Sequence, residues 1–389
     1  MLAIPCSLMR GGSSKGGMFL DADLPSDPGR RAAMLLASYG SPDMRQIDGI
    51  GGADPLTSKA AVVGRSSRVD ADLDYTFYQV GIDSPRVSMG GTCGNMLAAV
   101  APFALFRGLI PPPSGRSEVV ARIHATNTGQ VFTARFQADG GYHLVDGESA
   151  IAGVPGTSSP IRLDFGDCAG SMSGRLLPTG QERDVITIDG RNIPVSLVDA
   201  ATPFVFVRAT DIGAGGHELP SQLANMPEAM RRLEHIRAWA AGILGLVENS
   251  EDAAAKTPNV PRVVMVSPSI PYGTVNGEEL EADKMDVCVR QLAMQRPHKA
   301  LAVTGSVCTA VAARIRNSVV AECTTGTGDI VRIGHPSGVT TVRCTLGAVP
   351  GAHYKIQTAE IERTARLIMH GHVLVRQSHF DRILLSLNT

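Results

Sequence analysis

The stretch of sequence that decides the fold is CGNMLAAVAPFALFR, residues 93–107. It predicts a helix over 94–107 whose side chains are apolar on every side instead of along one stripe. Such a helix leaves no face for water, so the rest of a domain must surround it. We therefore expect this helix to lie at the centre of a domain, inside a layer of strands.

The segments around this helix in the first half of the chain are mostly strand-like. They are short, rich in β-branched and aromatic residues, and separated by Gly and Pro turns. The predicted strands are 75–80, 119–124, 131–136 and 142–145, with another strand at the N-terminus. One further helix is predicted over 28–38, from its run of Ala, Met and Leu.

The second half of the chain repeats this plan. Its predicted strands are 185–188, 194–198, 204–208, 262–266, 318–321, 329–333, 340–346 and 371–375. Its predicted helices are 226–244, 279–294 and 359–369. A short helix of small residues is predicted over 307–315, and Cys308 lies near its start as Cys93 lies near the start of the first apolar helix. We therefore expect the two halves to be pseudo-symmetric.

Length and composition agree with two globular domains. The chain has 389 residues, against roughly 100–200 per domain in general. Its hydrophobic fraction of 43% and charged fraction of 19% argue against disorder. We expect an α+β fold with domains 1–184 and 185–389, the last segment of the chain packing back on the first domain.

Charge and cysteine content exclude several classes of protein. The formal net charge of −1 provides no basic surface for nucleic acid or an anionic membrane. The longest apolar stretch, 96–106, is shorter than the ~18 residues of a membrane span, and the N-terminus has no signal-peptide pattern. The seven cysteines are odd in number and form no C-x-x-C pair, so we expect a cytoplasmic protein with neither a disulfide framework nor a zinc ribbon.

A glycine-rich loop, RGGSSKGG at 10–17, follows the first predicted strand. Its backbone N–H groups, hydroxyls and basic residues suit an anion site, although a plain turn is an equally good interpretation. No Gly-Lys-Ser/Thr follows, so the loop is not a P-loop. In GIGGAD at 49–54, Asp54 stands where a dinucleotide fingerprint needs its third glycine.

Two residues of the first half are candidates for proton transfer. Cys93 precedes the buried helix, whose free N–H groups and partial positive charge favour a thiolate or a bound carboxylate; a core cysteine is the alternative. Lys59 opens an apolar strand-like run, where a buried amine can act as a base. The alternative is a lysine whose amine reaches solvent from the end of the strand.

The second half of the chain contains two polar motifs with candidate binding residues. The motif TGSVCT at 304–309 lies at a helix start, and RIGHPSG at 332–338 forms a polar turn after a strand. Capping of a helix explains the first motif equally well, and a histidine in a turn is commonly a hydrogen-bonding residue. No second histidine or carboxylate stands at metal-ligand spacing, so we predict no metal and no cofactor.

These motifs occur in a fixed order together with several others. The full series is IPCSLMRGGSSKG at 4–16, RQIDGIGGADPLTSK at 45–59, CGN at 93–95, NTG at 127–129, GVPGT at 153–157, LPTG at 177–180, GHPSG at 334–338 and RTAR at 363–366. The series covers almost the whole chain, and it strongly resembles that of the PrpF-like isomerase family.

The resemblance implies a diaminopimelate-epimerase-like fold. Such a fold has two similar domains, each a curled, mostly antiparallel sheet around a central helix, with the active site in the cleft between them. Members isomerise 2-methylaconitate, aconitate, methylitaconate or 4-oxalomesaconate by a 1,3-allylic proton shift, without metal or organic cofactor. The resemblance therefore implies an isomerase or tautomerase that acts on a small polycarboxylate.

The resemblance also implies roles for particular residues. Lys59 would be the principal proton-transferring residue, Cys93 would lie beside or opposite it, and Cys308 would be the second-domain cysteine. The residues at 89–92 depart from the common pattern of the family, while Cys93 and the two residues after it match it. Expected substrate contacts are Arg10, Gly12, Ser13, Ser14, Lys15, Ser58, Gly94, Asn95, Thr304, Ser306, Thr309, His335 and Ser337.

Other functions remain open at this point. Two cysteines facing each other would suit an amino-acid racemase or epimerase, and the anion-binding loops alone would suit a protein that binds carboxylates without catalysis. Among substrates, the run from 40 to 59 resembles oxalomesaconate tautomerases and methylitaconate isomerases more than methylaconitate isomerases. We expect 4-oxalomesaconate, with 2-methylaconitate, aconitate and methylitaconate as the alternatives. The prediction allows a homodimer and includes no nucleic acid and no membrane as partners.

Overall fold

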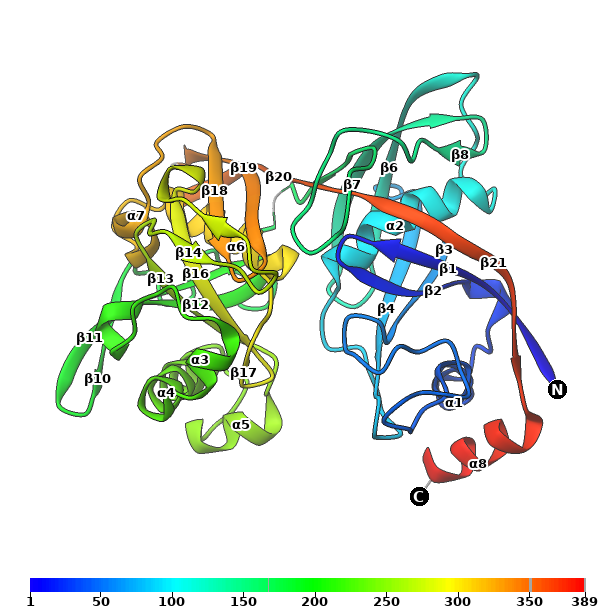
Figure 1. Cartoon of the computed structure of the whole chain (residues 1–389), viewed down its shortest axis with the longest axis horizontal. Helices are drawn as coiled ribbons and strands as arrows, with labels where there is room; N and C mark the ends of the chain where they lie inside the picture. Colours follow the sequence, from blue (N-terminus) through cyan, green and yellow to red (C-terminus); the bar gives the residue numbers. More distant parts are fainter. Residues whose placement is uncertain (167, 350–351, 388–389) are drawn as a thin grey trace. The chain divides into compact units, whose positions relative to one another are not determined.

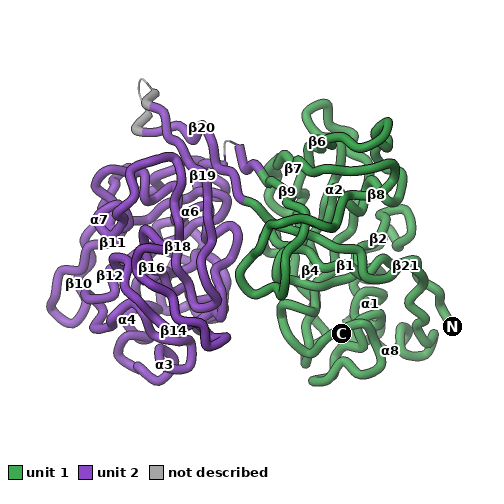
Figure 2. The backbone as a smooth tube through the Cα atoms, turned by 45° about the horizontal axis from the view of Figure 1, so that its top comes forward, with its two compact units in different colours: residues 1–163, 362–389 green, residues 164–361 purple. Residues whose placement is uncertain are grey.

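The structure is a computed structural model that describes residues 1–166, 168–349 and 352–387. The chain folds into two compact units, coloured separately in Figure 2. Unit 1 consists of Met1–Leu163 and Glu362–Thr389, and unit 2 consists of Asp164–Ile361. Both units combine strands with a few helices, which confirms the predicted α+β class.

Unit 1 is a mostly antiparallel sheet with strand order β21–β1–β2–β3–β4–β6–β7–β8. Only the β2–β3 and β4–β6 pairs among these are parallel. The strands are β1 (Leu2–Gly11), β2 (Ser14–Leu20), β3 (Lys59–Arg65), β4 (Leu73–Val80), β6 (Arg116–Ala125), β7 (Gln130–Asp139), β8 (Tyr142–His143) and β21 (Ala365–Val375). Figure 1 shows β1, β2 and β3 beside helix α2.

Helix α2 (Gly94–Phe106) is the predicted buried helix, and the structure confirms it. Gly94 and every residue from Met96 to Leu105 are buried. The helix packs against β1, β2, β3, β6 and β8, so the strands cover it on several sides. Helices α1 (Pro28–Tyr39) and α8 (Gln377–Leu387) pack on each other and share a second core with β1 and β3.

Unit 2 is built on strands in the order β10–β11–β12–β13–β16–β18–β19–β20. The strands are β10 (Asp184–Ile188), β11 (Arg191–Ala200), β12 (Thr202–Arg208), β13 (Arg262–Ser267), β16 (Val287–Ala293), β18 (Ile330–His335), β19 (Gly338–Val349) and β20 (Ala352–Arg363). Its main helices are α4 (Pro227–Ile243) and α6 (Val303–Arg314).

The two units share one topology. From β1 to β7, neighbouring strands pair antiparallel, parallel, antiparallel, parallel and antiparallel, with α1 after β2 and α2 before β6. From β11 to β19 the pairings follow the same sequence, with α4 after β12 and α6 before β18. The predicted pseudo-symmetry is therefore confirmed, and α6 is the counterpart of α2.

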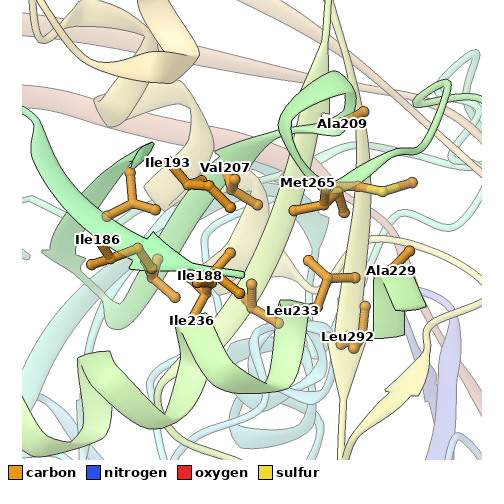
Figure 3. Packing of buried hydrophobic residues seen from close by; sticks show 14 of the residues in the cluster. Ile186, Ile188, Ile193, Val207, Ala209, Ala229, Leu233, Ile236, Met265 and Leu292 are labelled. Atoms are coloured by element: carbon orange, nitrogen blue, oxygen red, sulfur yellow. The ribbon is translucent and has the colours of Figure 1, made fainter. Parts of the chain in front are cut away.

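The largest described core cluster of unit 2 lies between α4 and strands β10 to β13. Figure 3 shows Leu233 and Ile236 of α4 among Ile188, Val207 and Met265 of the strands. These side chains are almost fully buried. The helix around 226–244 was predicted from its amphipathic pattern, and this core is what its apolar face covers.

Three predicted elements are wrong. The expected helix over 279–294 is instead a short strand, β15 (Glu279–Leu280), a 3-10 turn and β16. Val287–Ala293 lies between β13 and β18, and a short buried apolar run does not distinguish strand from helix. The expected helix over 359–369 belongs to β20 and β21, which pair with β19 and β1. The expected strand over 318–321 begins α7 (Val319–Cys323), because the Ser318 hydroxyl caps it.

The unit boundary falls at residue 163, earlier than the expected boundary at 184. The segment after 163 belongs to unit 2 because Ala169 bridges Ala200 and the Gly170 N–H donates to the Asp199 carbonyl at 2.8 Å. The end of the chain returns to unit 1, where β21 pairs with β1 over ten residues.

Candidate active site

One side of the unit 1 strands faces helix α2, and we call it the α2 face. Two glycines identify it. A Cβ on Gly11 would overlap the Asn95 carbonyl oxygen and lie 3.2 Å from the Ala99 Cβ. A Cβ on Gly16 would lie 3.2 Å from the Met96 methyl carbon. Both glycines therefore lie where the strands approach the first turns of α2.

Register places three polar side chains on the α2 face. Residues directly opposite each other on paired strands point to the same side of a sheet. Ser14 is opposite Gly11, Lys59 is opposite Gly16, and Gln79 is opposite Lys59. These three side chains thus point toward α2 from β2, β3 and β4.

Lys59 is held by its neighbours on β4. Its Nζ donates to Gln79 Oε1 at 2.9 Å and lies 5.2 Å from the centre of the Phe77 ring, and the residue is 9% exposed. The Gln79 amide nitrogen donates to the carbonyls of Ser58 at 2.9 Å and Pro55 at 3.2 Å, which fixes its oxygen toward Lys59. A lysine amine therefore has a fixed position on this face.

The backbone of Lys59 is also anchored. The Tyr39 hydroxyl donates to the Lys59 carbonyl and accepts from the Gly17 N–H at 2.7 Å. Burial raises the pKa of Tyr39 far above its usual range, so the phenol stays protonated as this bridge requires. Gly17 of β2 and Lys59, the first residue of β3, are thus connected through one side chain from α1.

Cys93 is the N-cap residue of α2 and is partly exposed. Its carbonyl accepts from the Leu97 N–H at 2.9 Å and from the Tyr75 hydroxyl at 3.2 Å, while its thiol caps no N–H group of the helix. The first N–H groups of a helix have no partner inside it and carry partial positive charge. This end of α2 can therefore stabilise an anion close to the thiol.

The turn between β1 and β2 closes over the start of α2. Gly12 has φ of +52°, and a Cβ there would overlap the Asn95 side-chain oxygen, so the position requires glycine. The Asn95 amide nitrogen donates to Ser13 Oγ at 3.1 Å. Ser14 Oγ is buried and has no hydrogen-bond partner among the described residues. A polar ligand here would find an unpaired hydroxyl.

Three expected substrate contacts have other partners or lie on the other side of the strands. Arg10 donates from one nitrogen to the Gly12 carbonyl and to the carbonyl and hydroxyl of Thr364, at 2.9–3.0 Å. Burial, together with the charge of Arg366, lowers the pKa of Arg10. Lys15 is opposite Arg10, so strand alternation directs both away from the α2 face. Ser58 donates to Gln46 Oε1 at 2.8 Å.

Cys308 does not occupy the position in α6 that the sequence predicted. The helix begins at Val303 with Ala302 as its N-cap, so Cys308 lies in the second turn and is 0% exposed. Its thiol donates to the Val198 carbonyl at 3.4 Å, and burial raises the pKa of Cys308 well above its ordinary value. The counterpart of Cys93 is therefore Ala302, and Cys308 is a core residue of unit 2.

The remaining expected contacts in unit 2 lie in α6 and in the turn after β18, and some of them form hydrogen bonds within the unit. Ser306 Oγ donates to the Ala302 carbonyl at 3.1 Å, Thr304 lies in the first turn of α6, and Thr309 Oγ1 is buried without a described partner. His335 Nε2 lies 2.9 Å from Thr340 Oγ1, and its Nδ1 accepts from the Ser337 N–H at 3.2 Å. The Ser337 hydroxyl donates to the Lys299 carbonyl. The bonds of His335 and Ser337 stabilise the turn after β18.

The structure thus gathers part of the predicted site around the start of α2. Lys59, Cys93, Gly94, Asn95, Gly12, Ser13 and Ser14 lie there. Sequence reasoning missed Gln79 and Phe77, whose contact with Lys59 depends on the pairing of β3 with β4. Alternation along 73–80 places both on one side of a strand, but only the register identifies their neighbour.

Among residues 1–166, 168–349 and 352–387, no three metal-ligating side chains come together, and no helix is long and apolar enough to cross a bilayer.

Comparison with known proteins gives long matches. The model of the family described as PrpF protein matches residues 1–376. The 3-methylitaconate isomerase of Eubacterium barkeri is 40% identical over 380 residues, which are 97% of this chain and 98% of the relative. The 4-oxalomesaconate tautomerase of Pseudomonas putida is 41% identical and covers 96% of each chain. The 2-methyl-aconitate isomerase of Shewanella oneidensis is 34% identical, over 96% of this chain and 97% of the relative.

Solved structures agree with these matches. A crystal structure of methylitaconate-delta-isomerase has a TM-score of 0.85, 40% identity and 97% coverage of each chain. A hydroxyproline epimerase from Agrobacterium vitis has a TM-score of 0.53 at 14% identity, covering 97% of this chain and 94% of its own, and so shows the epimerase-like fold alone. The chain belongs to the PrpF family and is an isomerase.

Proposed function

We propose that this isomerase moves a carbon–carbon double bond by a 1,3-allylic proton shift in an unsaturated di- or tricarboxylate. The observation that carries the proposal is the placement of Lys59 on the α2 face, with its amine fixed by Gln79 beside Phe77. The relatives with 34–41% identity whose names state a substrate act on methylitaconate, oxalomesaconate or methylaconitate. Their names support the same class of substrate.

The proposed reaction needs one base and one stabilised anion. The neutral Lys59 amine takes the proton from the allylic carbon, so that a C–H bond breaks and an N–H bond forms. The electron pair spreads through the double bond to the carboxylate as a dienolate. Lys59 then returns the proton at the far carbon, and the double bond is left one position along. If Cys93 gives this proton instead, its thiolate regains a proton and the Lys59 ammonium loses one through solvent before the next turnover. The N–H groups at the start of α2 stabilise the charge that develops.

A racemase with two opposed cysteines is a weaker candidate. That chemistry needs one acid–base residue from each half of the protein. In unit 2 the counterpart of Cys93 is Ala302, which cannot carry a proton, and Cys308 is enclosed in the core. The side chains favour a reaction in which the proton leaves and returns within reach of unit 1.

We propose 4-oxalomesaconate as the first substrate to test and methylitaconate as the second. Two relatives at 40–41% identity carry names with oxalomesaconate, and one at 40% carries methylitaconate. These acids differ by small groups, whose discrimination is worth roughly 1–3 kcal/mol in a pocket.

The experiment is a substrate panel followed by proton NMR. Purified protein is incubated separately with 4-oxalomesaconate, methylitaconate, 2-methylaconitate and cis-aconitate, and the position of the double bond is recorded over time. We expect one acid, first 4-oxalomesaconate, to be isomerised fastest. The absence of isomerisation with all four acids would contradict the proposed substrate class.

A further inference from the structure

We propose that Arg363 binds a carboxylate of the substrate at the N-terminal end of α2. The proposal rests on the proposed function for the chemical class of the ligand. Its own evidence is the position of Arg363, which ends β20 two residues before the β1–β21 pairing begins, its burial, and its lack of a salt bridge among the described residues. Sequence reasoning noted this arginine only as part of the motif 363–366, with no role.

Strand pairing gives the side on which Arg363 lies. Ala365 is directly opposite Gly11, whose missing side chain would point into Asn95 and Ala99. Ala365 therefore lies on the α2 face, and it is fully buried. Arg363 precedes it by two residues, so in an extended chain its side chain points to the same side. Arg366 is on the opposite side and is exposed.

The direction in which α2 runs relative to β21 shows which end of the helix lies near Arg363. Leu367 of β21 and Met9 of β1 line a cavity of about 260 Å³ together with Pro102 and Phe106 of α2. Leu367 thus lies near the C-terminal half of the helix. Two residues earlier, Ala365 lies at the level of its first turns. From Ala365 back to Arg363 an extended chain covers about 6.6 Å, which equals the rise of roughly four residues of helix. Arg363 is therefore level with Cys93, the N-cap residue of α2.

The guanidinium of Arg363 is buried without a matching anion. Arg363 is 7% exposed, and its described hydrogen bond is from one nitrogen to the Glu362 carbonyl at 2.8 Å. It forms no salt bridge among the described residues. Burial lowers the pKa of Arg363 to about 10, and the charge of Glu362 offsets this in part. A buried cation costs free energy unless an anion pairs with it, and a bound carboxylate would supply that pair.

Other groups on the same face complete a carboxylate site. Ser14 is 1% exposed, its hydroxyl has no described partner, and it faces α2 opposite Gly11. The free N–H groups at the start of α2 lie at the same end. A planar guanidinium can bind both oxygens of a carboxylate at once. A carboxylate held there would place its neighbouring carbon on the same face as Lys59.

The test measures binding without turnover. Tricarballylate is a saturated tricarboxylate that cannot isomerise, and its neutral triamide is the matched ligand without charge. Binding of both is measured by calorimetry to the full-length protein and to Arg363→Met. We expect tricarballylate to bind at least roughly 10-fold more weakly to the variant, because a hydrogen-bonded charge pair is lost. Binding of the triamide is expected to be the same for both proteins.

Arg366→Met is the matched control. It removes the same charge three residues away, from the exposed side of β21. We expect it to bind tricarballylate as the unchanged protein does. The melting temperature of Arg363→Met is expected to be equal or higher, because the variant removes a buried cation that forms no salt bridge with the described residues of the free protein.

Several results would overturn the inference. Unchanged affinity of Arg363→Met for tricarballylate would do so, and so would an equal loss of affinity for the triamide, since this indicates structural damage. Should the Met variant fail to fold, Arg363→Lys is compared with Arg363→Gln, and the inference requires the lysine variant to bind tricarballylate more tightly. A protein that binds tricarballylate through Arg363 but isomerises no acid would contradict the proposed function and leave this inference standing.

Discussion

Helices α2 and α6 occupy the same place in the same topology, yet their N-terminal ends differ in chemistry. At the start of α2 the N-cap is Cys93, whose side chain caps no N–H group. At the start of α6 the N-cap is Ala302, and its N–H donates to Gln291 Oε1 at 3.2 Å. Unit 2 has the Gln291 amide at this end, and its nitrogen has no partner among the described residues. Unit 1 has a thiol there, and the Ser14 hydroxyl on the facing strand has no described partner.

The first residues of the corresponding strands differ in the same way. β3 begins with Lys59 above Phe77, and β13 begins with Arg262 above Phe204 at 6.0 Å. An arginine remains charged at any physiological pH, whereas a lysine can release its proton. At these two pairs of corresponding positions, unit 1 carries Cys93 and Lys59, which can transfer a proton, and unit 2 carries Ala302 and Arg262. This difference favours a mechanism in which one base of unit 1 both removes the proton and returns it.

The largest expected effect is from Lys59→Met. Removing the proposed base is expected to lower kcat by roughly 10²–10⁴-fold, the usual contribution of a positioned acid–base group. Arg262→Met, the matched change in unit 2, is expected to keep activity close to that of the unchanged protein. The kcat of both variants is measured by steady-state kinetics on the acid that the substrate panel identifies. Circular dichroism is the control for folding. Equal losses in the two variants would remove the distinction between the units.

The next effect separates the two cysteines. Cys93→Ala is expected to lower kcat, because the thiol lies at the helix end that stabilises the anion. Cys308→Ala is expected to keep kcat while lowering the free energy of unfolding by about 1–2 kcal/mol, because it leaves a cavity in the core. Kinetics and urea denaturation measure the two quantities. A larger loss of kcat in Cys308→Ala than in Cys93→Ala would reverse the assignment.

A substitution at Gln79 tests whether Lys59 acts as a base. Gln79→Glu places a carboxylate 2.9 Å from the Lys59 amine, which favours the ammonium form. The neutral base then exists only at higher pH, so the acid limb of the kcat/KM profile is expected to move up by at least about one pH unit. Gln79→Met is expected to lower activity without that upward shift. If Gln79→Glu reduced kcat with an unchanged pH profile, Gln79 would have only a structural role.

The smallest effect is on thiol reactivity. All seven cysteines lie in the described ranges, and Cys93 is the one that is partly exposed. We expect one thiol of the native protein to react quickly with a thiol reagent, and tricarballylate to slow that reaction. Peptide mass spectrometry identifies the residue. Fast modification of Cys308 would be inconsistent with its burial.

The sequence predicted those parts of the fold and site that depend on local pattern. The helix of 94–107 was identifiable because it is apolar all round, and its N-cap cysteine followed from its start. Lys59 stood out as a charged residue on an apolar strand. Cys308 was misplaced because α6 consists of small residues with no capping side chain, so the sequence does not mark its start at Val303.

The rest of the candidate site depends on pairings between distant segments. Arg363 reaches the α2 face only because β21 pairs with β1, more than 350 residues away along the chain. Gln79 reaches Lys59 only in one register of β3 against β4. A shift of one residue in either pairing would point these side chains to the other side of the sheet. Such registers are set by the packing of the whole unit and not by local sequence.

The most direct test of the account follows the proton itself. The protein is incubated with its substrate in D2O, and proton NMR records both the double-bond position and the exchange of the allylic hydrogen, for Lys59→Met beside Arg262→Met. The account predicts isomerisation and deuterium incorporation with Arg262→Met and neither with Lys59→Met. Full exchange with the folded Lys59→Met variant would contradict the claim that Lys59 transfers the proton.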